Sequence, residues 1–164
     1  MSILLTGATG FLGSHILDSL QNRGDKVKVI AREESKSKLA QWSNIEEVVL
    51  TQNLFLESED WMCAALEGVD RIIHAAWYAE PGKYLTSDLN LECLAGSLRL
   101  ARAANAMGVK KFVGIGTCAE YADSDEPKTI HTPLSPKLLY STCKAACYSV
   151  LDKYFEDKPT EFAW

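Results

Sequence analysis

The feature that most constrains the fold is a glycine-rich stretch near the start of the chain, Thr6-Gly7-Ala8-Thr9-Gly10-Phe11-Leu12-Gly13. A short apolar run, Ile3-Leu4-Leu5, precedes it, and the apolar spacing that follows, at Ile16, Leu17 and Leu20, is helical. A strand, a tight turn and a helix therefore come in succession. This is the setting in which a glycine pattern indicates a phosphate-binding turn.

The three glycines are expected to have separate roles. Gly7 allows the tight turn, Gly10 lets a pyrophosphate approach the backbone, and Gly13 lets the helix and strand pack closely. The helix N-terminus offers free N–H groups and a partial positive charge to phosphates. The alternative is a tight turn without a ligand. We expect a dinucleotide to contact the turn and the first helical residues: Gly7, Thr9, Gly10, Phe11, Leu12 and Gly13.

Composition limits the class of protein. A length of 164 residues predicts one domain, 1–164, and 47% hydrophobic with 24% charged residues is typical of a soluble globular chain. A net charge of −5 argues against nucleic acid or an anionic membrane surface as the main partner. The longest apolar run, 72–79, is too short to span a membrane. The chain enters its first strand at once, so we expect no signal peptide.

The chain has five cysteines without a framework spacing, which favours reduced thiols in a cytoplasmic protein. Cys143 and Cys147 lie one helical turn apart, but no further ligands cluster with them in the sequence. Packing is the favoured role, and we expect no metal site.

The second predicted strand, 26–31, bears on the choice of cofactor. An acidic residue about 20 positions after the glycine pattern binds the ribose of NAD, whereas an Arg nearby suits the 2′-phosphate of NADP. Ala31 and Arg32 occupy this region, which favours NADP over NAD. Glu33 and Glu34 follow and blur this preference, and the alternative for Arg32 is an ordinary solvated side chain.

The third and fourth predicted strands, 45–50 and 69–76, add further candidates. Asn53 and Leu54 follow the third strand, where Asn53 either reaches the adenine or forms a turn. The fourth strand ends in His74-Ala75-Ala76, and its small residues leave room for a ligand at the carboxyl edge of the sheet. A lone histidine such as His74 is more often a hydrogen-bonded core residue than a catalyst.

The remaining pattern continues the alternation of strands and helices. We expect helices over 36–41, 59–68, 89–107 and 136–156, a fifth strand over 110–117, and the start of a sixth over 160–164. Pro136 is predicted to open the last helix. This order predicts an α/β fold, a doubly wound parallel sheet with helices on both faces and right-handed crossovers. The ligand crevice belongs where the strand order reverses.

Tyr140 and Lys144 form a second constellation, at i and i+4 on the last predicted helix. A nearby ammonium lowers the pKa of a phenol, which can then exchange the proton of a carbonyl–alcohol pair while hydride moves at the adjacent carbon. The lysine can also bond a cofactor ribose. Thr117, at the end of the fifth strand, can hold the substrate oxygen beside Tyr140. The alternative is a surface pair on an amphipathic helix.

Together, Thr6–Gly13, His74–Ala76, Gly116-Thr117-Cys118-Ala119-Glu120-Tyr121 and Tyr140–Lys144 resemble the extended short-chain dehydrogenase/reductase family, in its NAD-dependent epimerase/dehydratase group. The resemblance implies a Rossmann-type domain that binds NAD or NADP on the glycine turn, and catalysis by Thr117, Tyr140 and Lys144. It implies a nucleotide-sugar substrate. It also implies a homodimer through a four-helix bundle formed by 89–107 and 136–156.

Three departures from the family pattern modify these expectations. Cys118 and Ala119 stand where dehydratases carry an Asp-Glu pair, which disfavours dehydration. Ala31 and Asn53 stand where NAD-using members usually carry Asp, so the cofactor choice stays open. The family continues for about as many residues again, so this chain resembles an amino-terminal half, truncated after five to six strands and without the substrate-binding part.

Two functions are therefore expected. The first is an enzyme that reduces a 4-keto sugar nucleotide, or epimerises one through a 4-keto intermediate. The second is a dinucleotide-binding fragment or module without turnover of its own. A sheet that ends in an unfinished strand is also expected to self-associate unless another chain covers its edge.

Overall fold

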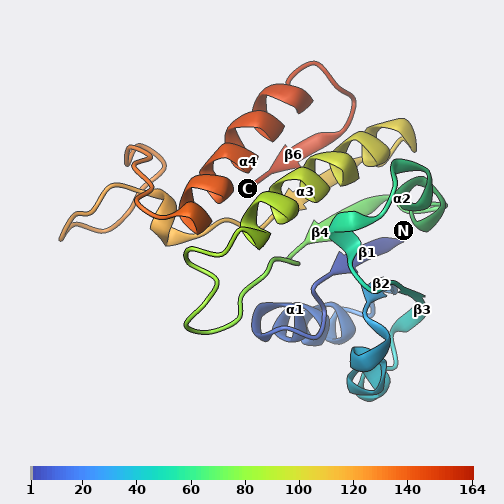
Figure 1. Cartoon of the computed structure of the whole chain (residues 1–164). Helices are drawn as coiled ribbons and strands as arrows, with labels where there is room; N and C mark the ends of the chain where they lie inside the picture. Colours follow the sequence, from blue (N-terminus) through green and yellow to red (C-terminus); the bar gives the residue numbers. More distant parts are fainter. Residues whose placement is uncertain (1) are drawn as a thin grey trace.

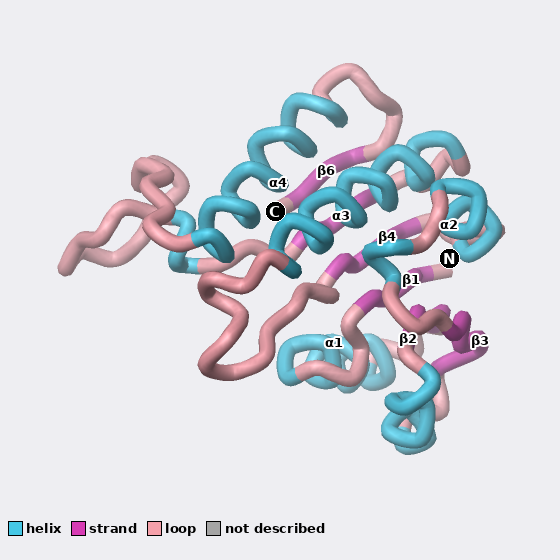
Figure 2. Tube along the Cα trace, viewed as in Figure 1, coloured by secondary structure: helices cyan, strands magenta, loops and turns pink. Residues whose placement is uncertain are grey.

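Six strands form one parallel sheet in the computed structural model, which describes residues 2–164 (Figures 1 and 2). The strands are β1 (Ile3–Thr6), β2 (Val27–Ala31), β3 (Ile45–Leu50), β4 (Arg71–His74), β5 (Lys111–Gly114) and β6 (Glu161–Ala163). The α-helices are α1 (Phe11–Asn22), α2 (Glu59–Ala65), α3 (Leu89–Ala106) and α4 (Leu139–Phe155). Three 3₁₀ segments join them: η1 (Glu33–Gln41), η2 (Leu54–Leu56) and η3 (Cys118–Glu120).

The strand order is β3-β2-β1-β4-β5-β6, with every neighbouring pair parallel. The chain first builds outward from β1 to β3 and then returns to add β4 on the other side of β1. The order therefore reverses between β1 and β4, where the carboxyl ends of the two strands leave a crevice for a ligand. Thr6 pairs with His74 at this point, so the glycine turn and the end of β4 are neighbours. The expected α/β fold is confirmed.

The two faces of the sheet are covered by different helices. Figure 1 shows α3 and α4 on one side of the sheet and α1 on the other. The α1 side buries alternate residues of β1 and β2, such as Leu5 and Val29, against Leu17 of α1 and Trp42 beyond η1. These strands are buried on both faces, as expected for a parallel sheet, which explains why their sequences are apolar with little alternation.

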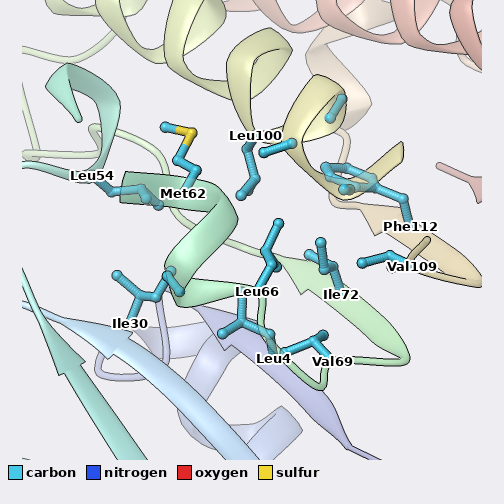
Figure 3. Packing of buried hydrophobic residues seen from close by; sticks show 14 of the residues in the cluster. Leu4, Ile30, Leu54, Met62, Leu66, Val69, Ile72, Leu100, Val109 and Phe112 are labelled. Carbon is cyan, nitrogen blue, oxygen red and sulfur yellow. The ribbon is translucent and has the colours of Figure 1, made fainter. Parts of the chain in front are cut away.

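The larger core lies between the sheet and the layer of α2, α3 and α4. Figure 3 shows Leu4, Ile72 and Phe112 of the sheet facing Met62 and Leu100 of the helices. All five side chains are fully buried. Burying a side chain of this size contributes about 1.5–3 kcal/mol. This cluster therefore holds α3 and α4 against strands β1, β4 and β5.

The α1 side is less completely covered. A hollow lies between the end of α1 and strands β4 to β6, with Ile73 and Val113 on its floor and the cationic side chains of Arg71 and Lys111 around it. Within residues 2–164 no helix packs over this part of the sheet (Figure 1). The doubly wound arrangement is therefore complete over β1 and β2 and one-sided over β5 and β6.

Several boundaries differ from those that the sequence predicts. The fourth and fifth strands are shorter than expected, because pairing with their neighbours ends at His74 and Gly114. The last helix begins at Leu139 rather than at Pro136. Leu138 is extended, and its N–H and C=O both bond the Ser141 hydroxyl, which caps the helix after the proline. The sixth strand is confirmed, as β6 pairs in parallel with β5.

Candidate active site

The glycine turn connects β1 to α1 at the point where the strand order reverses. Gly7 has a φ of +73°, and a Cβ at this position would lie 2.6 Å from the Ala76 nitrogen. Both the backbone conformation and the space therefore require glycine. The Gly10 N–H bonds the Gly7 carbonyl at 3.0 Å and closes the turn.

Gly13 brings the first turn of α1 onto the glycine turn itself. A Cβ on Gly13 would lie 2.0 Å from the Gly7 carbonyl oxygen, closer than atoms can approach. The sequence predicts close packing of helix and strand here. In the structure, Gly13 instead packs against the turn that follows the strand, at Gly7 and Ala8.

Gly10 differs from the other two glycines, because its missing side chain leaves open space. A Cβ at Gly10 would meet only the Gly7 oxygen, at 3.3 Å, and would otherwise point to solvent. Gly10 caps α1, and no side chain in the described chain accepts a hydrogen bond from this helix end. Phe11 beside it is 86% exposed. Uncapped N–H groups beside an open surface fit a pyrophosphate.

The segments after β2 and β3 are placed near the same edge of the sheet. Arg32 follows β2 and pairs with Glu34 at 3.0 Å, in a hollow that Gln52 also lines. Its charge is thus partly neutralised, and NADP remains a prediction. The Asn53 side chain accepts the Phe55 N–H at 3.1 Å and caps η2, so its oxygen serves a turn. Leu54 is buried in the core.

His74 is a buried link between β1, β4 and α3. Its Nδ1 lies 2.7 Å from the Thr6 Oγ1, and its Nε2 lies 2.8 Å from the Ser97 Oγ. The Ser97 hydroxyl donates to the Cys93 carbonyl at 2.7 Å, so it can only accept from His74. The imidazole therefore carries a proton on Nε2, and in the neutral ring Thr6 donates to Nδ1. The Thr6 oxygen is left to accept the Ala76 N–H, at 3.2 Å.

This chain of bonds decides between the two interpretations of His74. Burial, the largest influence, lowers the pKa of His74 from its ordinary 6.5 to about 3, and the positive charge of Lys144 acts in the same direction. An imidazole that is neutral, fully bonded and 3% exposed cannot exchange protons with a substrate. His74 is a structural residue that fixes the backbone of Ala75 and Ala76 against the glycine turn.

Tyr140 and Thr117 lie together at the carboxyl end of the sheet. Tyr140 is in the first turn of α4, and its N–H bonds the Leu85 carbonyl at 3.0 Å. Burial, the largest influence, raises the pKa of Tyr140, and the nearby Thr117 side chain acts against it. Tyr84 packs edge-on against the Tyr140 ring, with 4.8 Å between centroids. The predicted proximity of Thr117 and Tyr140 is thus found.

Lys144 does not act on Tyr140 in the way the sequence suggests. Its ammonium bonds the Ile115 carbonyl at 2.7 Å and lies 4.1 Å from the centroid of the Trp77 ring. Burial, the largest influence, lowers the pKa of Lys144 to about 8. The expected lowering of the Tyr140 pKa is therefore wrong for this structure. The i, i+4 spacing puts both residues on one helix face, but burial dominates the phenol and a carbonyl holds the ammonium.

Comparisons with known proteins show the family to which the chain belongs. A model of a family described as the NAD dependent epimerase/dehydratase family matches residues 3–164. The chain belongs to the NAD-dependent epimerase/dehydratase family. The resemblance that the motifs carry is thereby confirmed, and the glycine turn, His74-Ala75-Ala76 and Tyr140–Lys144 all lie inside the matched region.

Relatives in this epimerase/dehydratase family include enzymes that act on sugar nucleotides. The chain is 28% identical to a UDP-glucose 4-epimerase of Erwinia amylovora, over 97% of this chain and 50% of that protein. It is 30% identical to a UDP-glucose 4-epimerase of Klebsiella pneumoniae, over 78% of this chain and 96% of that sequence. The UDP-glucose 4-epimerase of Thermus thermophilus, solved with NAD, has a TM-score of 0.77 and 26% identity, over 99% of this chain and 53% of that one. The chain thus spans about half the length of the Erwinia and Thermus relatives.

Sequence reasoning assigned no role to four residues of the site. Trp77 and Tyr84 flank Lys144 and Tyr140, and no polarity pattern marks them. Glu120 and Trp164 bond each other beside Thr117. A signal did exist for Glu120, because Thr117-Cys118-Ala119-Glu120 has the Thr-x-x-Glu spacing of a capping box.

No three His, Cys, Asp or Glu side chains within 2–164 are grouped so that they could hold a metal ion. No helix in this range combines the length and the apolar character needed to cross a bilayer.

His74 makes the stability of this chain sensitive to acid. Below pH 6.5 His74 is protonated in the unfolded chain but stays neutral in the folded chain. The free energy of unfolding is therefore highest above pH 6.5 and decreases as the pH falls toward about 3. A shift of this size corresponds to at most about 5 kcal/mol of unfolding free energy. We expect His74→Asn to weaken this loss, as measured by urea denaturation between pH 6.5 and 4. His131→Asn, at an exposed position, should retain the wild-type slope, and a wild-type slope in His74→Asn would contradict the assignment.

Proposed function

We propose that the chain is the cofactor-binding part of an NAD(P)-dependent oxidoreductase that acts on a nucleotide-activated sugar, by 4-keto reduction or by epimerisation through a 4-keto intermediate. The observation that carries the proposal is the placement of Thr117 and Tyr140 close together, at the same edge of the sheet as the glycine turn. The sugar nucleotides in the names of the relatives support the substrate class.

In this proposal the dinucleotide lies on the glycine turn, with its pyrophosphate at Gly10 and the first turn of α1. Ala75 and Ala76 border the turn from the β4 side and leave room for the ligand. Arg32 faces the adenosine end and favours NADP, whereas the NAD complex of the Thermus relative supports NAD. Lys144 bonds the ribose next to the nicotinamide once it leaves the Ile115 carbonyl.

The proposed chemistry at Tyr140 is proton transfer to the sugar oxygen. When bound, the nicotinamide supplies or accepts the hydride at the sugar carbon. The Tyr140 phenol, whose pKa is not below its ordinary value, is protonated at neutral pH and is the proton donor to a 4-keto oxygen in this proposal. Thr117 lies close to the phenol and holds the same oxygen. The reverse proton transfer requires a positive charge close to the phenol, which Lys144 can provide by moving toward it.

Dehydration remains the less favoured chemistry. Elimination needs a free acid and base beside the sugar, and Cys118 and Ala119 occupy the exposed positions after Thr117. The next carboxylate, Glu120, is 1% exposed, and its two oxygens are bonded to protein groups. It cannot reach a substrate.

Calorimetric titration of NAD and NADP into this chain tests the cofactor site. We expect binding of both, with NADP tighter, and Arg32→Ala should weaken NADP more than NAD. Gly10→Ala should weaken both by at least about tenfold, because its methyl group occupies the phosphate position. Its melting temperature should fall only modestly, because the added carbon meets one protein atom, the Gly7 carbonyl oxygen, at a tight 3.3 Å. Wild-type binding by Gly10→Ala would contradict the site.

Tyr140→Phe tests the chemistry. In the presence of the dinucleotide and UDP-glucose we expect turnover to fall by about 100-fold or more, with dinucleotide binding unchanged, because only the proton donor is lost. Tyr148→Phe, on the same helix but packed against Phe162, should retain turnover. Equal turnover by Tyr140→Phe and wild type would exclude Tyr140 as the acid.

The second candidate is a dinucleotide-binding module without turnover. The half-length match to the Erwinia and Thermus relatives favours it for these 164 residues. A wild-type chain that binds the dinucleotide but shows no turnover with UDP-glucose would support the module over the enzyme.

We also propose a homodimer through α3 and α4, which lie alongside each other on the outer face of the molecule (Figure 2). Leu91 on α3 is 53% exposed and Val150 on α4 is 47% exposed. In light scattering we expect the wild-type chain to have the mass of two chains, and Leu91→Glu the mass of one. Leu56→Glu, also at an exposed leucine but on η2, should stay dimeric. Self-association that persists in Leu91→Glu would point to the β6 edge, and a monomeric wild type would contradict both interfaces.

A further inference from the structure

Glu120 is a buried carboxylate that bridges two distant parts of the chain. It is 1% exposed, and its Oε1 accepts the Thr117 N–H at 2.8 Å. Its Oε2 accepts the indole N–H of Trp164 at 3.1 Å. The ion pairs found within residues 2–164 include none to Glu120, so these two hydrogen bonds, together with the nearby positive charge of Lys144, compensate its burial.

The Trp164 indole packs directly against the backbone of β5 and of the residues that follow it. A Cβ on Gly114 would lie 2.3 Å from the indole, and one on Gly116 would lie 2.5 Å from the indole nitrogen. The Tyr148 and Phe162 rings lie 6.1 and 6.3 Å from the indole centroid. The two glycines thus leave the backbone free of side chains where the indole packs, and the Tyr148 and Phe162 rings hold the indole in this position.

The turn between Thr117 and Glu120 is held by further bonds. The Thr117 Oγ1 accepts the Ala119 N–H at 3.3 Å, and the Thr117 carbonyl accepts the Glu120 N–H at 3.2 Å. The Glu120 carbonyl accepts the Ser135 N–H at 2.8 Å, which ties the turn to the loop before α4. Among these bonds, the link that extends toward β6 is the one made by the Glu120 side chain.

We infer that Trp164 and Glu120 are a positioning pair: the indole fixes the Glu120 carboxylate, which fixes the Thr117 backbone and thereby the hydroxyl that meets Tyr140. This inference rests on the proposed function for the role of Thr117, and neither member of the pair touches the reacting atoms. Its consequence is that the end of β6, 44 residues from Glu120, sets the geometry of the catalytic edge.

Amide hydrogen exchange of the ¹⁵N-labelled full chain tests the pair without any need for turnover. We expect Trp164→Phe to speed exchange of the Thr117 amide by about tenfold or more, because the carboxylate that accepts this N–H loses its anchor. The amides of β1 and β4 should keep wild-type rates, which distinguishes local release from global destabilisation. Trp42→Phe is the matched control, because Trp42 also donates to a carboxylate, Asp18, at 2.7 Å.

Glu120→Gln provides a second variant with a smaller change in shape. An amide has one acceptor oxygen, so it retains one of the two bonds and leaves the other N–H without its partner. If the two residues act in series, the double variant Glu120→Gln/Trp164→Phe should exchange at Thr117 no faster than the worse single variant. Additive effects would overturn the inference, as would wild-type Thr117 exchange in Trp164→Phe.

A kinetic readout separates positioning from simple structural support. In the wild-type background, Trp164→Phe should lower kcat about tenfold while the Kd for the dinucleotide and the KM for UDP-glucose stay unchanged. A rise in KM or Kd with unchanged kcat would overturn the positioning role. If wild type has no turnover, the proposed function fails, whereas the exchange experiment still decides whether the pair holds Thr117.

Discussion

The close approach of two backbone segments at the reversal of strand order is the constraint on which the rest of the site depends. Gly7 after β1 and Ala75-Ala76 after β4 come so near that a Cβ on Gly7 would overlap the Ala76 nitrogen. The hydrogen bonds through Thr6, His74 and Ser97 hold this approach from inside the sheet. Because the crevice is formed by backbone, its shape depends on a few small residues, and the open space at Gly10 is what remains for a ligand.

Burial determines the ionisation of the site. Desolvation raises the pKa of the Tyr140 phenol and lowers the pKa of Lys144 to about 8, so each group is shifted toward its neutral form. The ammonium gains a carbonyl and the face of Trp77 in place of water. The same physics keeps His74 neutral. The phenol therefore keeps its proton at neutral pH, whereas Lys144 and His74 release theirs more readily than they would in water.

Much of the architecture could be predicted from periodicity and turn residues. The apolar runs of β1 and β2 indicate strands buried on both faces, and Gly24 and Gly108, both at positive φ, mark the ends of α1 and α3. The residues at which helices and strands begin and end were harder to predict. Pro136 is a strong helix-start signal, yet α4 begins at Leu139, where the Ser141 hydroxyl bonds the backbone of the extended Leu138. Several neighbouring residues could start this helix, and the sequence does not show which of them is favoured.

The sequence by itself determined the order of strands and helices, the glycine turn and the presence of Tyr140 and Lys144 on one helix face, because each follows from spacing within a few residues. Only the tertiary structure decided where the charges and hydrogen bonds go. Lys144 turns to the Ile115 carbonyl instead of the phenol, and Glu120 meets Trp164 across 44 residues. Both outcomes depend on desolvation and on which distant groups come within about 3 Å, and these properties arise only when the sheet and helices have packed.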